Sequence, residues 1–413
     1  MYGLFIHGKG SNMSYTYYIS SFSYCIHPAI YKEWATLYLS NKIKKIKTPI
    51  DQTEVILSYW MESEMYIEET IEIIKSYNFK KITIIADFSQ KSKCDLIDGI
   101  DVTYLNIYPL ILKNMQSQHQ EEPRWNPCLV KGLLLAGAHI VRTNRIVLLK
   151  KLYDKQQLLI DKIMWTCPHI KKYSEELTNI FFPNINRSEV DNFINYCDEQ
   201  SVFIPGFFVN NANYEEANEF ASTQEGDALA DLFKQTNFSI VTESEYLSPD
   251  IDNSEFFTEK IYRAIYNKHP FILVGAPKCL SALKAMGFKT FENYLPIPEY
   301  DNILDLFPRL DAIVDNIVAF PDAIAQYSSN INDDIDYNYA LLNDNMNRDL
   351  TFLNNLCIKK NLPVDTFEFC FPVNWSDIKK QIASVKEFNR QSQELIAERI
   401  LTSKYKKYID FKI

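Results

Sequence analysis

Glycine is scarce in this chain, with 10 residues among 413. The loop His7-Gly8-Lys9-Gly10-Ser11 contains two of them, but it lacks a Lys-Ser/Thr pair at the spacing of a P-loop. The eight cysteines form no Cys-x-x-Cys pair, and no Cys/His set has zinc spacing. These absences argue against a P-loop enzyme and a structural zinc module. They favour the reduced, mostly buried thiols of a cytoplasmic protein.

The chain also has no apolar run of the roughly 20 residues that a membrane-spanning helix requires. The N-terminal sequence MYGLFIHGKGSNM lacks a basic region followed by a long apolar core, so we expect no signal peptide. A net charge of −10 does not favour a nucleic-acid binder. The densest basic patch of the N-terminal part is formed by Lys42, Lys44, Lys45 and Lys47. A solvated strand or loop face explains that patch better than a binding surface does.

The residues that are abundant fit a protein of two globular domains. Hydrophobic residues make up 46% of the 413 residues and aromatic residues 14%, which is enough for two cores. Asparagine, lysine and isoleucine are frequent, as in proteins from AT-rich genomes such as those of many viruses. The polar, proline-punctuated stretch at 114–127 predicts a linker. We expect domains at 1–125 and 126–325 and a C-terminal helical segment at 326–413.

In the first domain, short apolar runs alternate with an amphipathic segment. This alternation indicates a doubly wound α/β domain with buried parallel strands. The expected strands are Tyr2–Ile6, Glu54–Trp60, Lys81–Ala86 and Val102–Tyr108, and the expected helix is Glu62–Tyr77.

Two residues of this domain are candidates for a catalytic base. His7 and Asp87 both follow predicted strands, and open α/β sheets bind their ligands at strand ends. Either side chain could take a proton from an attacking hydroxyl. A structural hydrogen bond for His7 and a helix cap for Asp87 explain the same positions.

The second domain repeats the alternation, most clearly over residues 238–287. Thr258 is a good N-cap for a helix there, and Pro270 ends that helix before the next strand. The expected strands are Leu129–Ala136, Lys162–Trp165, Phe238–Val241 and Phe271–Val274. Three helices are expected: one over Ile146–Leu159, one that Thr258 caps and Pro270 stops, and one after Pro277 that ends at Gly287.

The turn from strand to helix in this stretch suits a phosphorylated ligand. A helix N-terminus offers free N–H groups and a positive dipole end to phosphate oxygens, and Lys260 would add a full charge. Glu243 or Glu259 could accept hydrogen bonds from ribose hydroxyls. An equally good explanation is that Glu259 is an ordinary first-turn acid and Lys260 its solvated neighbour.

The segment FFTEKIYRAIYNKHPFILVG resembles the TEK donor-site motif of alpha-1,3-fucosyltransferases. It is more similar to a group of uncharacterised viral and bacterial glycosyltransferase-like proteins, and this similarity continues through residues 276–291. The resemblance covers roughly 55 of the 413 residues. Thr242-Glu243-Ser244 replaces the Phe-Glu-Asn of the fucosyltransferases, and Asn267-Lys268-His269 stands where a glycine is usual.

The resemblance implies a GT-B-like fold, with two Rossmann-like α/β domains and C-terminal helices that pack back on the first domain. It implies a nucleotide-sugar donor held by Glu243, Thr258, Glu259 and Lys260. Arg142 and Arg145, in a segment that loosely resembles another loop of the same group, could bind the pyrophosphate as a fork. The expected reaction is inverting transfer of a hexose or pentose to a hydroxyl, without an obligatory metal or other cofactor.

The acceptor stays open at this point. A glycan, a lipid-linked sugar, a protein side chain or a hydroxymethylated base of phage DNA would each supply a hydroxyl, and the last would place the protein in a host cytoplasm. The alternative is a non-catalytic nucleotide- or sugar-binding protein that kept the fold. Asp333, Asp334 and Asp336 are better explained as a solvated charge run than as a metal site. The oligomeric state does not follow from the sequence.

Overall fold

The structure is a computed structural model of the chain. It describes residues 3–7, 14–22, 36, 39–40, 43–44, 46, 49–60, 67–87, 98–105, 109–110, 123–129, 131–135, 143–157, 162–166, 187–200, 231–243 and 257–360. Contacts divide the chain into two compact units, one of residues 1–114 with 346–413 and one of residues 115–345. Each unit has its own sheet.

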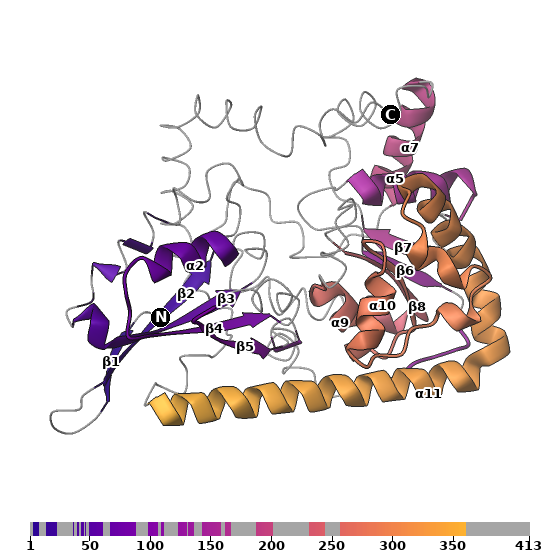
Figure 1. The fold of residues 1–413 in the computed structure, drawn as a ribbon. Helices are drawn as coiled ribbons and strands as arrows, with labels where there is room; N and C mark the ends of the chain where they lie inside the picture. The colour runs from indigo at the N-terminus through magenta and orange to yellow at the C-terminus, as the bar shows by residue number, and fades with distance from the viewer. Residues whose placement is uncertain are drawn as a thin grey trace. The chain divides into compact units, whose positions relative to one another are not determined.

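Both units combine strands with helices, and in the second unit the two alternate from β6 to α10, so the chain is an α/β protein (Figure 1). The strands are β1 Gly3–His7, β2 Ser14–Phe22, β3 Thr53–Trp60, β4 Lys81–Asp87, β5 Asp101–Leu105, β6 Gly132–Leu135, β7 Ile163–Thr166, β8 Phe238–Thr242 and β9 Phe271–Val274. The α-helices are α2 Ile67–Lys75, α5 Thr143–Asp154, α7 Arg187–Gln200, α9 Glu259–Tyr266, α10 Cys279–Ala285 and α11 Leu306–Lys360.

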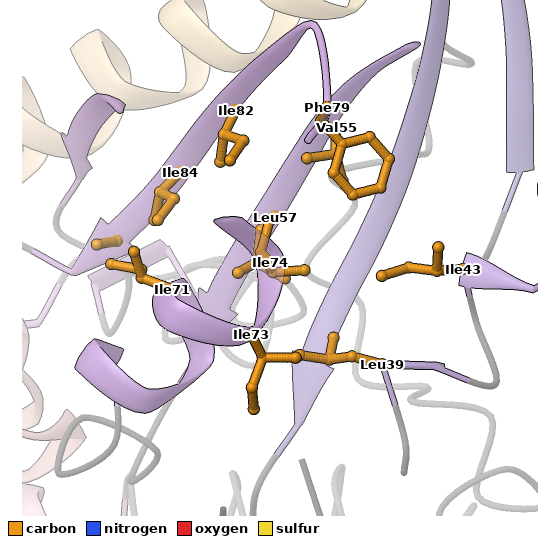
Figure 2. Close-up of a cluster of buried hydrophobic side chains, with 11 residues drawn as sticks. Leu39, Ile43, Val55, Leu57, Ile71, Ile73, Ile74, Phe79, Ile82 and Ile84 are labelled. Atoms are coloured by element: carbon orange, nitrogen blue, oxygen red, sulfur yellow. The ribbon is translucent and has the colours of Figure 1, made fainter. Parts of the chain in front are cut away.

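The first unit contains a five-stranded sheet in the order β1-β2-β3-β4-β5. Strands β2 to β5 are parallel to one another, which confirms the expectation of parallel pairing for β3, β4 and β5. A core of aliphatic side chains from β3, β4 and α2 covers the sheet, with Leu57, Ile74 and Ile84 fully buried (Figure 2). Among the described strands the spatial order follows the chain order, without the reversal that a doubly wound sheet has.

Strand β1 departs from the sequence-based expectation. It pairs antiparallel with β2, so the expectation that a parallel strand precedes the glycine-containing loop is wrong. His7, the last residue of β1, pairs with Ser14, the first residue of β2. Strand β2 itself was not expected, because the alternation of polar and aromatic residues in its sequence SYTYYISSF is confined to Ser14–Tyr17. Its aromatic and β-branched residues were the available signal.

The second unit contains a four-stranded parallel sheet in the order β7-β6-β8-β9. Strand β6 is the first of these in the chain, and its neighbours are β7 on one side and β8 on the other. The direction of winding therefore reverses between β6 and β8. This order is that of a doubly wound, Rossmann-like sheet, and the carboxyl edge at such a reversal is where these folds bind ligands.

Helix α11 carries the chain from the second unit into the first. Its helical geometry is interrupted at Tyr327, where φ is −117° and ψ is 23°. In the second unit, Lys151 of α5 forms an ion pair of 2.5 Å with Asp311 of α11. In the first unit, Lys360 pairs with the buried Glu54 of β3. The part of the expected C-terminal helical segment beyond residue 360 lies outside the described residues.

Four cysteines lie in the described part of the chain, and all are free thiols. Cys197, Cys279 and Cys357 are buried, whereas Cys128 is exposed. Burial raises the pKa of the Cys279 thiol well above its ordinary value, and nearby Asp301 adds to the shift. This cysteine is therefore a core side chain rather than a nucleophile. Within the described ranges, no helix is both long and apolar enough to cross a membrane.

A substitution at Gly132, the first residue of β6, can test the packing of the second sheet. A Cβ atom added to Gly132 would lie 2.4 Å from Cζ of Phe238, a buried ring that packs edge-on against Phe320. We expect Gly132→Ala to destabilise the protein by about 1–3 kcal/mol in urea unfolding, because the ring must move. In a Phe238→Leu background the same change should cost less. Equal costs in both backgrounds would contradict this packing.

Candidate functional site

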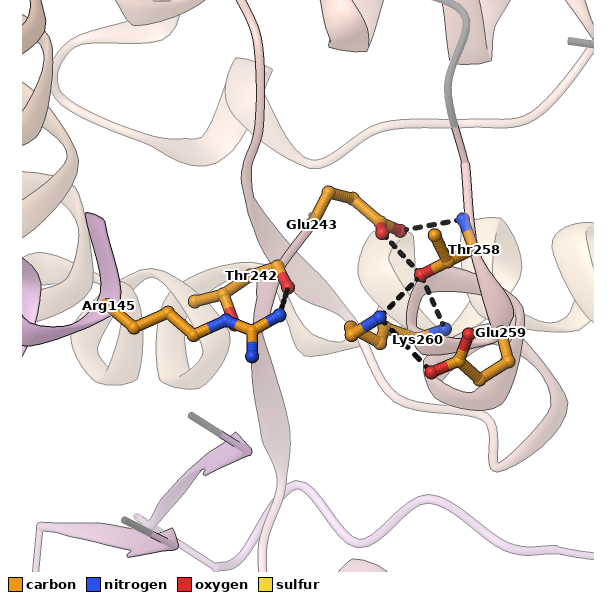
Figure 3. A network of polar contacts seen from close by, with 6 residues as sticks. All are labelled: Arg145, Thr242, Glu243, Thr258, Glu259 and Lys260. Carbon is orange, nitrogen blue, oxygen red and sulfur yellow. Dashed lines mark hydrogen bonds and ion pairs between the residues drawn. The ribbon is translucent and has the colours of Figure 1, made fainter. Parts of the chain in front are cut away.

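The polar cluster at the carboxyl edge of the second sheet is the candidate site (Figure 3). Strand β8 ends at Thr242 and leads directly into Glu243. Helix α5 follows β6, α9 follows β8 and α10 follows β9, so all three helices begin at this edge. The edge includes the reversal of winding between β6 and β8.

Thr258 caps helix α9, as the sequence predicts. Its backbone is extended, with φ −111° and ψ −177°, and its Oγ1 accepts a hydrogen bond from the N–H of Lys260 at 3.5 Å. The same oxygen accepts from Lys260 Nζ at 2.9 Å and lies 2.5 Å from Oε2 of Glu243. A threonine hydroxyl has one hydrogen and accepts two bonds. The hydroxyl therefore donates to Glu243, which accepts as a carboxylate.

Glu243 is almost completely buried, with 1% of its surface exposed. Its Oε1 accepts from the backbone N–H of Thr258 at 3.2 Å. Burial raises the pKa of Glu243, while Lys260 and the Thr258 hydrogen bonds oppose the shift. Both oxygens are directed at Thr258, so this geometry favours a role in positioning Thr258 over direct contact with a ribose.

Glu259 and Lys260 are the members of the cluster that reach solvent. Their side chains are 30% and 20% exposed, and Lys260 Nζ lies 3.1 Å from Oε1 of Glu259. Burial opposes ionisation of Glu259, but the positive charges of Lys260 and Arg263 prevail and lower its pKa to about 2. A ligand at this edge would therefore meet an ionised glutamate and a lysine.

Arg145 lies in α5 and is 4% exposed. Its Nη2 donates to the carbonyl oxygen of Thr242 at 3.2 Å. Figure 3 shows Arg145 reaching the end of β8 from the side opposite to Thr258 and Lys260. The buried guanidinium thus holds the last residue of β8, Thr242, directly before Glu243. Arg142, the other expected arginine, lies outside the described residues.

Asp301 is a member of this edge that the sequence did not predict. It is 5% exposed, and its Oδ1 and Oδ2 accept from the backbone N–H groups of Leu280 and Ser281 at 3.1 and 3.2 Å. The Ser281 hydroxyl donates to Oδ2 at 3.2 Å. Asp301 therefore occupies the N-terminus of α10. No local pattern indicates this contact, because about 20 residues separate the aspartate from the helix start.

The two candidate bases lie at opposite edges of the first sheet. Asp87 ends β4 and pairs with Leu105, the last residue of β5, so it lies at the carboxyl edge of the parallel strands. His7 pairs with Ser14, the first residue of β2, because β1 runs antiparallel to β2. It therefore lies at the amino edge of the parallel strands. A strand of this length separates the edges by about 20 Å. One active site cannot include both residues.

The acidic run in α11 makes contacts with neighbouring elements. Oδ2 of Asp334 accepts from the hydroxyl of Tyr294 at 2.8 Å, and Asp336 forms an ion pair of 3.0 Å with Lys268. Across the ranges that the structure describes, no group of three His, Cys, Asp or Glu side chains is placed to hold a metal ion. The two aspartates thus serve contacts with neighbouring elements.

No family model matches the chain, and no curated protein and no solved structure is significantly similar to it. The relationship to glycosyltransferases therefore stays a prediction from the local motif.

The Thr258 hydroxyl can be tested through folding stability. Thr258→Val keeps the shape of the side chain but removes the hydrogen-bond donor to Glu243, and we expect a loss of about 1–3 kcal/mol. A carboxyl whose folded pKa is raised destabilises the native state as the pH rises above its unfolded pKa of about 4.3. Losing the hydroxyl raises that pKa further, so the loss should be larger at pH 8 than at pH 4.

Urea unfolding at the two pH values measures this effect. Thr258→Ser keeps the hydroxyl and is the control, which should show little change with pH in its difference from the natural chain. A Thr258→Val loss of the same size at both pH values would mean that the hydroxyl does not stabilise the carboxylate of Glu243.

Proposed function

We propose that the chain is a nucleotide-sugar-dependent glycosyltransferase whose donor diphosphate binds at the carboxyl edge of the β7-β6-β8-β9 sheet. The observation that carries this proposal is the position of Lys260, at the start of α9 and beside the reversal of winding between β6 and β8. Ligands of open α/β sheets bind at such reversals, and a lysine near a helix N-terminus suits phosphate oxygens. The TEK resemblance supports sugar transfer as the chemistry.

In this proposal the acceptor hydroxyl attacks the anomeric carbon of the donor sugar. The bond from that carbon to the diphosphate oxygen breaks, and the nucleoside diphosphate leaves with the electron pair. Lys260 stabilises the negative charge that grows on the leaving group. A general base takes the proton of the acceptor. Arg145 positions the end of β8, and Glu243 positions Thr258 at the start of α9, beside Lys260.

A non-catalytic nucleotide- or sugar-binding protein is the second candidate. It is favoured by the fact that two helix N-termini at this edge are already capped by carboxylates of the chain, α9 by way of Glu243 and α10 by Asp301. Such capping leaves fewer free N–H groups for a phosphate. Donor turnover distinguishes the two candidates, because a binding protein would retain affinity without releasing sugar.

The lysine can be tested by titration of nucleoside diphosphates. We expect Lys260→Ala to weaken their binding roughly 10- to 100-fold, because a hydrogen bond between two charged groups is lost. Lys151→Ala is the matched control: this lysine is also partly buried, at 24% exposure, and forms an ion pair with Asp311 on another part of the unit. Calorimetry should show unchanged affinity for the control.

Mass spectrometry of sugar release across common nucleotide sugars tests the reaction itself. Release by the natural chain that falls in Lys260→Ala would support the transferase. Nucleotide binding without release from any donor would support the binding protein instead. Equal nucleotide affinity in Lys260→Ala and Lys151→Ala would contradict the assigned site.

Of the two candidate bases, Asp87 is the one whose place within its own sheet fits ligand binding, because it ends a parallel strand at the carboxyl edge. We expect Asp87→Asn to lower the transfer rate roughly 100-fold or more while leaving nucleotide affinity unchanged. His7→Ala should retain the rate, since His7 lies at the other edge. The opposite pattern, with loss only in His7→Ala, would show that the base is misassigned.

A further inference from the structure

The side chain of Lys260 is folded back over the first turn of α9. Adjacent residues of a helix do not normally face each other, yet Lys260 Nζ lies 3.1 Å from the carboxylate of Glu259 and 2.9 Å from Thr258 Oγ1 (Figure 3). The ammonium is therefore held at the N-terminus of its own helix. Its partners are the N-cap residue Thr258 and the first residue of the helix, Glu259.

This position is electrostatically unfavourable for a cation. A helix N-terminus carries a partial positive charge, and Arg263, one turn further along α9, adds a buried positive charge. The carboxylate of Glu259 offsets these charges and stays ionised at neutral pH, because its pKa is lowered to about 2 despite partial burial. The cluster thus places the positive charges of Lys260 and Arg263 near Glu259, the more exposed of its two carboxylates.

Glu259 is also the anion that can leave. Its side chain is 30% exposed, whereas Glu243 is 1% exposed and hydrogen-bonded to Thr258 through both oxygens. Rotation of the Glu259 side chain into solvent would break its ion pair with Lys260, while the hydrogen bonds from Lys260 Nζ and N–H to Thr258 Oγ1 remain. A place for a second anion would then open beside Lys260.

We propose that Glu259 is an internal competitor that occupies Lys260 in the unliganded chain, and that a phosphate group of the ligand replaces it. This inference rests on the proposed phosphate site, but it gives Glu259 the opposite role from the ribose contact expected from the sequence. A ligand must outcompete a tethered carboxylate, so Glu259 selects for polyphosphate ligands and against simple carboxylates and single phosphates.

The test is titration of the full-length chain with inorganic pyrophosphate. We expect Glu259→Gln to bind pyrophosphate roughly 3- to 10-fold more tightly than the natural chain, because an ion pair that the ligand must break is gone. In a Lys260→Ala background the same change should give no gain, since the two residues act through one contact. Asp336→Asn is the control, because it also removes a negative charge but pairs with Lys268 at the other end of α9.

Three results would overturn the inference: weaker binding in Glu259→Gln, which would mean direct contact with the ligand; unchanged binding; or an equal gain in Asp336→Asn, which would reflect net charge alone. The sugar-release measurement is separate. Tighter pyrophosphate binding in Glu259→Gln without sugar release from any donor would support the competitor and reject the transferase. Sugar release by the natural chain, with no gain in pyrophosphate affinity in Glu259→Gln, would support the transferase and reject the competitor.

Discussion

One hydroxyl group, Oγ1 of Thr258, determines the geometry of the carboxyl edge of the second sheet. It joins a buried carboxylate that follows β8 to the first turn of α9. A buried glutamate is stable as an anion only where hydrogen bonds replace its water, and Thr258 supplies two of these donors to Glu243. The start of α9 is therefore fixed to the end of β8, and Lys260 is fixed with it.

At this edge, two helices have a buried carboxylate bound to N–H groups at their N-terminus. Asp301 binds the first N–H groups of α10 from a distant point of the chain, as Glu243 binds the N–H of Thr258. Each carboxylate satisfies helix donors that would otherwise be buried without partners. The consequence for a ligand is specific: it meets side chains at this edge more than free backbone N–H groups. A phosphate would thus depend on Lys260 far more than on a helix dipole.

The sequence predicted the second sheet well because its strands are continuous apolar runs bounded by strong local signals. Thr258 as a cap and Pro270 before a strand act within a few residues, and the structure confirms both. In the related motif a glycine is usual where this chain has Asn267-Lys268-His269. Of these three residues, Lys268 has a left-handed backbone, with φ 55°. Glycine reaches that conformation without strain.

What the sequence did not predict depends on contacts between distant residues. Burial of Glu243 and the cap of α10 by Asp301 each involve a partner 15 and 21 residues away along the chain, respectively. The direction of β1 depends instead on its pairing with the next strand, β2. The carboxyl of Glu243 looks the same in the sequence whether it faces solvent or the core. Only the packing distinguishes a residue that contacts the ligand from one that positions other residues. Here the packing places Glu243 and Arg145 in the interior.

Net charge places a further constraint on how an anionic ligand reaches this edge. The chain carries a charge of −10, and a negative surface slows the approach of phosphates. Arg145 and Arg263 are buried, with exposed fractions of 4% and 7%, so salt screens their charges little. Lys260 and Arg263 offset the carboxylate of Glu259, so the negative charge of that side chain adds less to the repulsion that an incoming anion meets at this edge. An exposed basic patch of equal charge would lose most of this effect at physiological ionic strength.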